Sequence, residues 1–177
     1  MSNLINTIDN CKRFYHKEFV PQLPQTQKYP IDKLVIQNKI NGFNNYKMFS
    51  KNGEILGTMQ AIPERVDTPE FYPANDCYYS FYINRLDVLK RNNGVGRSFI
   101  KIARQESYRN ACEGRVHLIA KNPKDIHDKP DIFYRKCGFD SSNKYHIEKI
   151  DEAIKNNKPL ENLWQQTLMY LPLKKAK

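Results

Sequence analysis

A glycine-containing turn is the segment of the sequence best suited to bind an anion. It consists of Arg91, Asn92, Asn93, Gly94, Val95 and Gly96. We expect a strand before the turn and a helix after it, which leaves several backbone N–H groups unpaired at the positive end of the helix dipole. Gly94 and Gly96 leave room beside these groups, because neither has a Cβ. Positive charge is added by Lys90, Arg91 and Arg97. The turn is therefore predicted to bind phosphate oxygens.

Two common phosphate-binding motifs do not fit this turn. A dinucleotide-binding fingerprint needs a third glycine, whereas Arg97, Ser98 and Phe99 follow Gly96. A P-loop needs Gly-Lys-Ser or Gly-Lys-Thr, and the sequence contains neither. The turn of an acyl-CoA-binding enzyme remains as the third option.

The segments around the turn predict a mixed α/β (α+β) domain. An apolar stripe of Val95, Phe99 and Ile102 predicts a helix after the turn, and residues 78–88 have the composition of a central strand. Asn-Gly pairs at positions 41–42 and 52–53 predict tight turns, the second within a hairpin over residues 46–62. The other predicted elements are an opening helix over residues 4–19, a strand from Lys33, a loop over 63–76, a strand over 116–120, a short helix over 132–136 that ends at Gly138, a helix around Ile147, Ile150 and Ile154, and a strand over 162–173.

Composition narrows the class of protein. The length of 177 residues suits one domain over residues 1–177, and a hydrophobic fraction of 40% is enough for one core. The four cysteines are far apart, with no CxxC pair, so we expect reduced thiols and no metal site. The chain shows no signal-peptide pattern and no long apolar segment, from which we expect a cytoplasmic enzyme without membrane contact. A net charge of +10 favours anionic ligands, and both a nucleotide and a nucleic acid are anionic.

Three ordered motifs resemble those of the GNAT N-acetyltransferases. The turn fits the pattern (Arg/Gln)-x-x-Gly-x-(Gly/Ala), and residues 133–139, with the sequence FYRKCGF, are similar to the second signature of that family. Residues 52–57 are similar to the family's hairpin before the central strand. The resemblance covers roughly residues 46–140 and implies a mixed, splayed sheet flanked by helices, with acetyl-CoA inserted between residues 78–88 and 116–120.

The resemblance also implies roles for particular residues. Backbone groups near Leu86 and Val88 would hold the pantetheine arm, and the turn from Arg91 to Arg97 would hold the pyrophosphate. Tyr134 occupies the position that donates a proton to the CoA thiolate in many relatives. The implied reaction is direct attack of a primary amine on the thioester through a tetrahedral intermediate.

The sequence departs from the family pattern in three places. Relatives often carry an asparagine seven residues before the tyrosine, where this chain has His127; Asn122 is the alternative contact to the cofactor. The central strand lacks the acid that some relatives use as a general base, since positions 80–82 are occupied by serine, phenylalanine and tyrosine. The base is left unassigned, with Glu54, Glu70, Asp76 and Asp87 as candidates by acidity. The chain also begins with a helix where the family normally begins with a strand.

Three functions are compatible with these motifs. The first is an acetyltransferase acting on the amine of a small molecule, a peptide or a protein, as a monomer or a homodimer. The second is an acyl-CoA sensor without catalytic activity. The third is a toxin-like acetyltransferase of aminoacyl-tRNA, which the positive charge favours but which the lack of interleaved basic and aromatic residues disfavours.

Overall fold

The computed structural model describes residues 31–40, 42–66, 78–90, 93–121, 130–158, 160 and 166–173. Its elements are β1 (Ile31–Ile40), β2 (Phe43–Ser50), β3 (Ile55–Val66), β4 (Tyr78–Val88), α2 (Val95–Arg109), β5 (Val116–Lys121), α3 (Pro130–Lys136), α4 (Lys144–Asn156) and β6 (Gln166–Leu171). The helix predicted over residues 4–19 lies outside the described residues.

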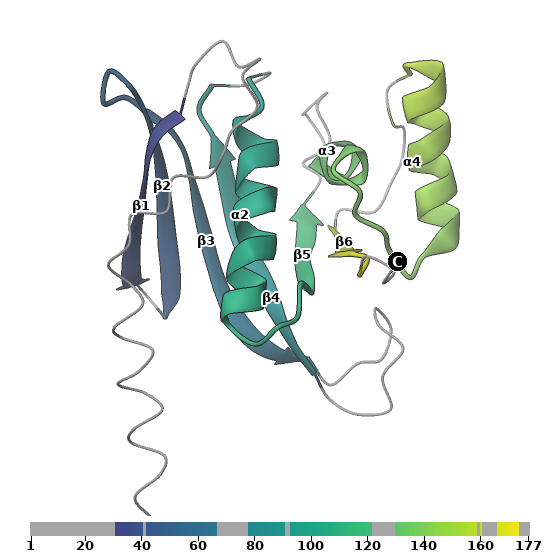
Figure 1. The fold of residues 1–177 in the computed structure, drawn as a ribbon. Helices are drawn as coiled ribbons and strands as arrows, with labels where there is room; N and C mark the ends of the chain where they lie inside the picture. Colours follow the sequence, from purple (N-terminus) through teal and green to yellow (C-terminus); the bar gives the residue numbers. More distant parts are fainter. Residues whose placement is uncertain are drawn as a thin grey trace, which may run out of the picture.

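The six described strands form one sheet in the order of the sequence, β1 to β6. All neighbouring strands are antiparallel except β4 and β5, which are parallel. A parallel pair needs a crossover connection, and α2 provides it by crossing the sheet in contact with β3, β4 and β5 (Figure 1). The predicted fold class, a mixed sheet flanked by helices, is confirmed.

The main core lies between the sheet and α2. Each of the middle strands presents buried apolar side chains to the helix, among them Met59, Phe81 and Leu118, and the helix adds Val95 and Phe99. The predicted apolar stripe of the helix is therefore buried as expected. The opposite face of the same strands carries polar groups, since Gln60 accepts a hydrogen bond from Asn84 and donates one to Asn45.

A β-bulge divides β4 into two halves. Gln60 and Ala61 are adjacent in β3, but their partners in β4 are Arg85 and Ile83, so Asn84 is the extra residue. An inserted residue shifts the alternation of side chains by one position. Phe81 and Ile83 face α2 before the bulge, and Leu86 and Val88 take over that face after it.

The strands β4 and β5 pair at three positions: Phe81 with Val116, Tyr82 with His117, and Ile83 with Leu118. Beyond them, β5 continues along β6 as far as Lys121, and β4 continues along β3 as far as Val88. Within the described strands, the second half of β4 therefore has one edge that does not pair with β5. We call the point after Ile83 and Leu118, where the two strands separate, the fork.

Most predicted element boundaries agree with the structure to within a few residues. β4 begins and ends where it was predicted, and Gly42, Gly53 and Gly138 have the positive φ angles expected of turns and a helix end. One prediction was wrong: residues 63–66 belong to β3 and not to a loop. Proline is compatible with a strand that has lost one neighbour, and β3 pairs with β2 no further than Ala61.

None of the helices that the structure describes combines the length and the apolar composition needed to cross a bilayer.

The bulge predicts different results for deletion and substitution of Asn84. Deleting the residue removes the bulge, and it leaves Leu86 and Val88 facing α2, because Ile83 and Arg85 then follow each other in regular alternation. We therefore expect the deletion variant to keep a cooperative transition, with a free energy of unfolding lowered by about 0.5–3 kcal/mol through the lost bend and twist of β4. Asn84→Ala keeps the bulge and removes one long, exposed hydrogen bond, so the free energy of unfolding should change by no more than about 0.5 kcal/mol. Urea denaturation followed by circular dichroism measures both. Loss of the cooperative transition in the deletion variant would contradict the assignment of Asn84 as the extra residue, because Leu86 and Val88 would then no longer face α2.

Candidate functional site

The start of α2 has the features of an anion-binding helix terminus. Gly94 precedes the helix with a φ of 76°, a left-handed conformation that favours glycine, and its carbonyl accepts hydrogen bonds from the N–H and hydroxyl of Ser98. The first turn contains no acidic residue, and Gly94 supplies no side chain to cap the first N–H groups. Arg97 lies in this turn with an exposed side chain. The terminus is therefore positively polarised, and the Arg97 guanidinium adds positive charge to it.

Gly96 brings three elements together. A Cβ at this position would lie 2.7 Å from Cζ of Phe133 in α3 and 3.4 Å from Cγ2 of Val88 in β4. Glycine is required here by close packing, because the first distance is too short for any real side chain. The end of β4, the first turn of α2 and α3 thus meet at one point, which lies beyond the fork along β4.

Tyr134 is held in this meeting point by aromatic neighbours. Its ring packs edge to face on Phe133 and Phe139, with centroid distances of 5.2 and 5.5 Å. Burial raises the pKa of Tyr134 well above its ordinary value, and the negative charges that Cys137 and Asp87 can carry raise it further. The hydroxyl is therefore protonated at neutral pH and lies near the end of β4.

Arg97 also connects α2 to the segment that follows α3. Burial raises the pKa of the Cys137 thiol to about 11, although the Arg97 guanidinium hydrogen-bonds the thiol and acts in the opposite direction. The thiol is consequently neutral at physiological pH and is a poor nucleophile. Its contribution to the site is packing and a contact to Arg97.

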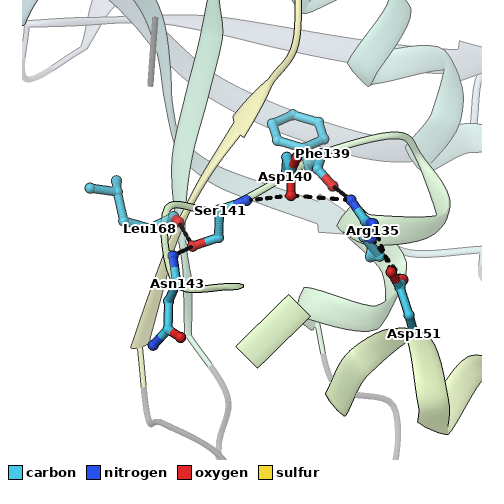
Figure 2. Close-up of polar contacts among 7 residues, drawn as sticks. All are labelled: Arg135, Phe139, Asp140, Ser141, Asn143, Asp151 and Leu168. Atoms are coloured by element: carbon cyan, nitrogen blue, oxygen red, sulfur yellow. Dashed lines mark hydrogen bonds and ion pairs between the residues drawn. The ribbon is translucent and has the colours of Figure 1, made fainter. Parts of the chain in front are cut away.

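The C-terminal end of α3 is fixed by the polar contacts drawn in Figure 2. Arg135 makes a bidentate ion pair with Asp151 of α4, at 2.8 and 2.7 Å, and donates to the carbonyl of Phe139 at 3.1 Å. Asp140 exchanges two backbone hydrogen bonds with Tyr170 of β6. The residue that follows Tyr134 therefore has a structural role, which is to hold the helix in place.

The N-terminal end of α3 is fixed by a buried polar cluster. Nε2 of His146 in α4 lies 3.1 Å from Oδ2 of Asp131 and 2.9 Å from Oγ1 of Thr167 in β6. Asp131 and His146 are both completely buried. With both ends of α3 tied to α4 and β6, the position of Tyr134 is well determined.

A second polar network lies on the opposite face of the sheet. Nδ1 of His117 in β5 is 2.9 Å from Oγ of Ser80 in β4, and Nε2 is 2.9 Å from Oε1 of Glu64 in β3. The His117 ring stacks on Tyr82, with centroids 5.1 Å apart. Burial lowers the pKa of His117, while the Glu64 carboxylate acts against that shift.

The structure brings together part of the predicted site. Leu86, Val88, Gly94, Val95, Gly96, Arg97 and Tyr134 lie around the contact between β4, α2 and α3, and Asn93 precedes Gly94 in the turn. Arg91, Asn92, Asn122 and His127 lie outside the described residues. The network of Glu64, Ser80 and His117 was not predicted, because three residues from three strands become neighbours through register alone. In the described part of the chain, no cluster of His, Cys, Asp and Glu has the arrangement of a metal site.

No protein-family model and no curated protein matches the chain. Among solved structures, the fold is similar to a bacterial toxin, with 12% identity, 74% of this chain and 68% of that chain covered, and a TM-score of 0.48. It is similar to Naa20 of Chaetomium thermophilum in complex with a bisubstrate analogue, with 17% identity, 74% and 65% coverage, and a TM-score of 0.45. It is also similar to AtaT complexed with acetyl-methionyl-tRNAfMet, with 10% identity, 71% and 69% coverage, and a TM-score of 0.45. The chain spans about two thirds of these proteins, and TM-scores below 0.5 define neither a family nor a function for it.

The contact at Gly96 predicts coupling between α2 and α3. Gly96→Ala should lower the free energy of unfolding by about 1–3 kcal/mol, because its Cβ would overlap the Phe133 ring. In a Phe133→Ala background the same change should cost much less, since the obstructing ring is gone. Urea denaturation of the four variants of this cycle measures the coupling. Additive effects would show that α2 and α3 do not pack through this pair.

Proposed function

We propose that the protein is an acetyltransferase that moves an acetyl group from acetyl-CoA to a primary amine. The observation that carries the proposal is that the edge of β4 beyond the fork leads to the end of β4, where the start of α2 and Tyr134 meet. A gap between parallel strands beside a positively polarised helix terminus suits a long ligand with phosphates at one end. The resemblance of residues 46–140 to the GNAT acetyltransferases gives this ligand its identity.

The described residues fit acetyl-CoA in chemical type. Arg97 and the N–H groups of the first turn of α2 would bind the pyrophosphate, and in our proposal Arg91, Asn92 and Asn93 complete that contact. Backbone groups near Leu86 and Val88 would bind the pantetheine arm, because this edge of β4 does not pair with β5 in the described strands. His127 and Asn122 remain the two alternatives for a further contact to the arm.

Bound acetyl-CoA would supply the acetyl group for attack by the amine. The role that we propose for Tyr134 is to donate its hydroxyl proton where the thiolate leaves. A phenol with a raised pKa keeps its proton throughout the neutral range, so a donor is always present. Its half-buried ring, in contact with Phe133 and Phe139, would limit the hydroxyl to few orientations.

Arg97 tests the binding half of the proposal. Arg97→Ala should raise the KM for acetyl-CoA about tenfold and leave kcat nearly unchanged, because contacts to the phosphates are equal in the ground state and the transition state. Lys101→Ala is the matched control, since Lys101 is an exposed cation one turn further along the same helix. Calorimetry of acetyl-CoA binding should show the same difference. A fall in kcat with an unchanged KM would contradict the assignment of Arg97 to the phosphates.

Tyr134 tests the catalytic half. Tyr134→Phe removes the hydroxyl and keeps the ring contacts, so we expect wild-type affinity for acetyl-CoA and a fall in kcat of about 10²- to 10⁴-fold. Tyr145→Phe is the control, because Tyr145 lies exposed on α4. Loss of an ordinary hydrogen bond would cost about tenfold or less, and a result in that range would make Tyr134 structural. Wild-type activity should show no alkaline limb from Tyr134 below about pH 10, since its pKa is raised above the ordinary value.

The acceptor is found by assaying transfer of labelled acetyl groups to small amines, peptides and charged tRNA. Charged tRNA belongs in the panel because the net charge of the protein is +10. Tight binding of acetyl-CoA without transfer to any of these acceptors would favour the sensor function, and failure to bind acetyl-CoA would remove the proposal. Light scattering during the same preparation distinguishes a monomer from a homodimer.

A further inference from the structure

The carboxylate of Glu64 is held in a fixed position by the network on the second face of the sheet. An ionised carboxylate can only accept hydrogen bonds, so Nε2 of His117 must be the donor to Glu64. In the neutral ring Nδ1 is then an acceptor, and the Ser80 hydroxyl must donate to it. Burial keeps His117 in this neutral form by lowering its pKa. The three side chains together therefore carry one negative charge.

Accessibility distinguishes the two ends of the network. The Ser80 side chain is completely buried, so its hydroxyl cannot reach the carbonyl of a substrate and a Ser-His-Glu nucleophile is excluded. The Glu64 side chain is 41% exposed and can receive a ligand. The hydrogen bond from His117 fixes one carboxylate oxygen of Glu64, and the exposed part of the carboxylate is available to bind a cation.

The network lies next to the fork. Glu64 is opposite Ser80, His117 is opposite Tyr82, and the following pair, Ile83 with Leu118, is the last before the strands separate. These side chains project from the face of the sheet opposite α2, whereas Tyr134 packs with the core on the α2 side. An acceptor that enters the fork from the second face would pass the Glu64 carboxylate.

The local charge also favours a cation at Glu64, although the whole chain is positive. Within the described part of the chain, no Lys or Arg forms an ion pair with Glu64. The guanidinium groups of Arg85 in β4 and Arg115, which precedes β5, form ion pairs with Asp87 and Glu113. The ring of Tyr82 lies against His117 and adds an aromatic surface of the kind that ammonium groups contact.

We propose that Glu64, positioned by His117 and Ser80, binds a second ammonium group of the acceptor, several ångströms from the nitrogen that is acetylated. The acceptor class is then a dicationic amine such as an aliphatic diamine. This inference rests on the proposed acetyltransferase function. Glu64 is a specificity-determining residue in this arrangement, and His117 and Ser80 are positioning residues.

The test compares cadaverine with pentylamine, which have the same carbon chain and differ by one amino group. In the wild type we expect the KM for cadaverine to be about tenfold or more below the KM for pentylamine. Glu64→Gln should remove most of this difference by raising the KM for cadaverine, with kcat for pentylamine and the affinity for acetyl-CoA unchanged. Glu152→Gln, which removes an exposed carboxylate on α4, should leave the difference intact. Equal preference for cadaverine in the wild type and Glu64→Gln would overturn the inference.

The positioning role of Ser80 is tested by measuring the binding of the diamine and not by enzyme activity. Calorimetric titration of cadaverine into the protein should show weaker binding for Glu64→Gln and for Ser80→Ala, with recovery in Ser80→Thr, which restores a hydroxyl. Loss of binding in Ser80→Ala without recovery in Ser80→Thr would overturn the positioning role. If acetyl-CoA does not bind the wild type, the proposed function fails. If acetyl-CoA binds and its acetyl group is transferred but cadaverine has no advantage, the inference about Glu64 fails alone.

Discussion

The short pairing between β4 and β5 is the constraint on which the candidate site depends. Both strands are fully engaged elsewhere, since β4 follows β3 to Val88 and β5 follows β6 to Lys121. The bulge at Asn84 bends β4 and increases its twist just where the pairing with β5 stops. The second half of β4, which is exposed or half-buried, therefore has a backbone edge that does not pair with β5 and can take hydrogen-bond partners from outside the sheet. A ligand bound along this edge would supply them.

Close packing at the end of β4 gives Gly96 a role that is independent of any phosphate. The residue touches Phe133 and Val88 so closely that a Cβ would not fit, which is why α2 can begin directly against α3. The close contact between these helices brings Tyr134 toward the end of β4. There the negative charge that Asp87 can carry contributes to the raised pKa of the Tyr134 hydroxyl. The same glycine that would admit a phosphate oxygen therefore also sets the position of the proposed proton donor.

Much of the fold was predictable from local patterns. The boundaries of β4, the stripe of α2 and the left-handed Gly138 follow from periodicity and turn chemistry, which act over a few residues. The strand over residues 63–66 was missed because a proline such as Pro63 usually indicates a loop. Here it is tolerated in a strand, since β3 no longer pairs with β2 beyond Ala61, and the sequence does not show where that pairing ends. The turn and Tyr134 were predicted from the motifs and stay a prediction as a site, whereas the contact of Gly96 with Phe133 is tertiary and could not be predicted from them. Glu64, Ser80 and His117 could not be found from the sequence, because only the register of three strands makes them neighbours.

The bulge also explains how β4 can present apolar side chains to α2 along its whole length and polar side chains on its other face. Before Asn84, Ser80 and Tyr82 point away from α2 and meet His117, so this half of β4 builds a polar surface. After Asn84, the alternation is shifted, and Leu86 and Val88 continue the apolar surface under α2 without interruption. Without the shift, Arg85 and Asp87 would occupy the core, and the end of β4 could not pack against Gly96. The inserted residue thus lets β4 keep its apolar face on α2 along its whole length while its first half contributes to a charged network on the other side.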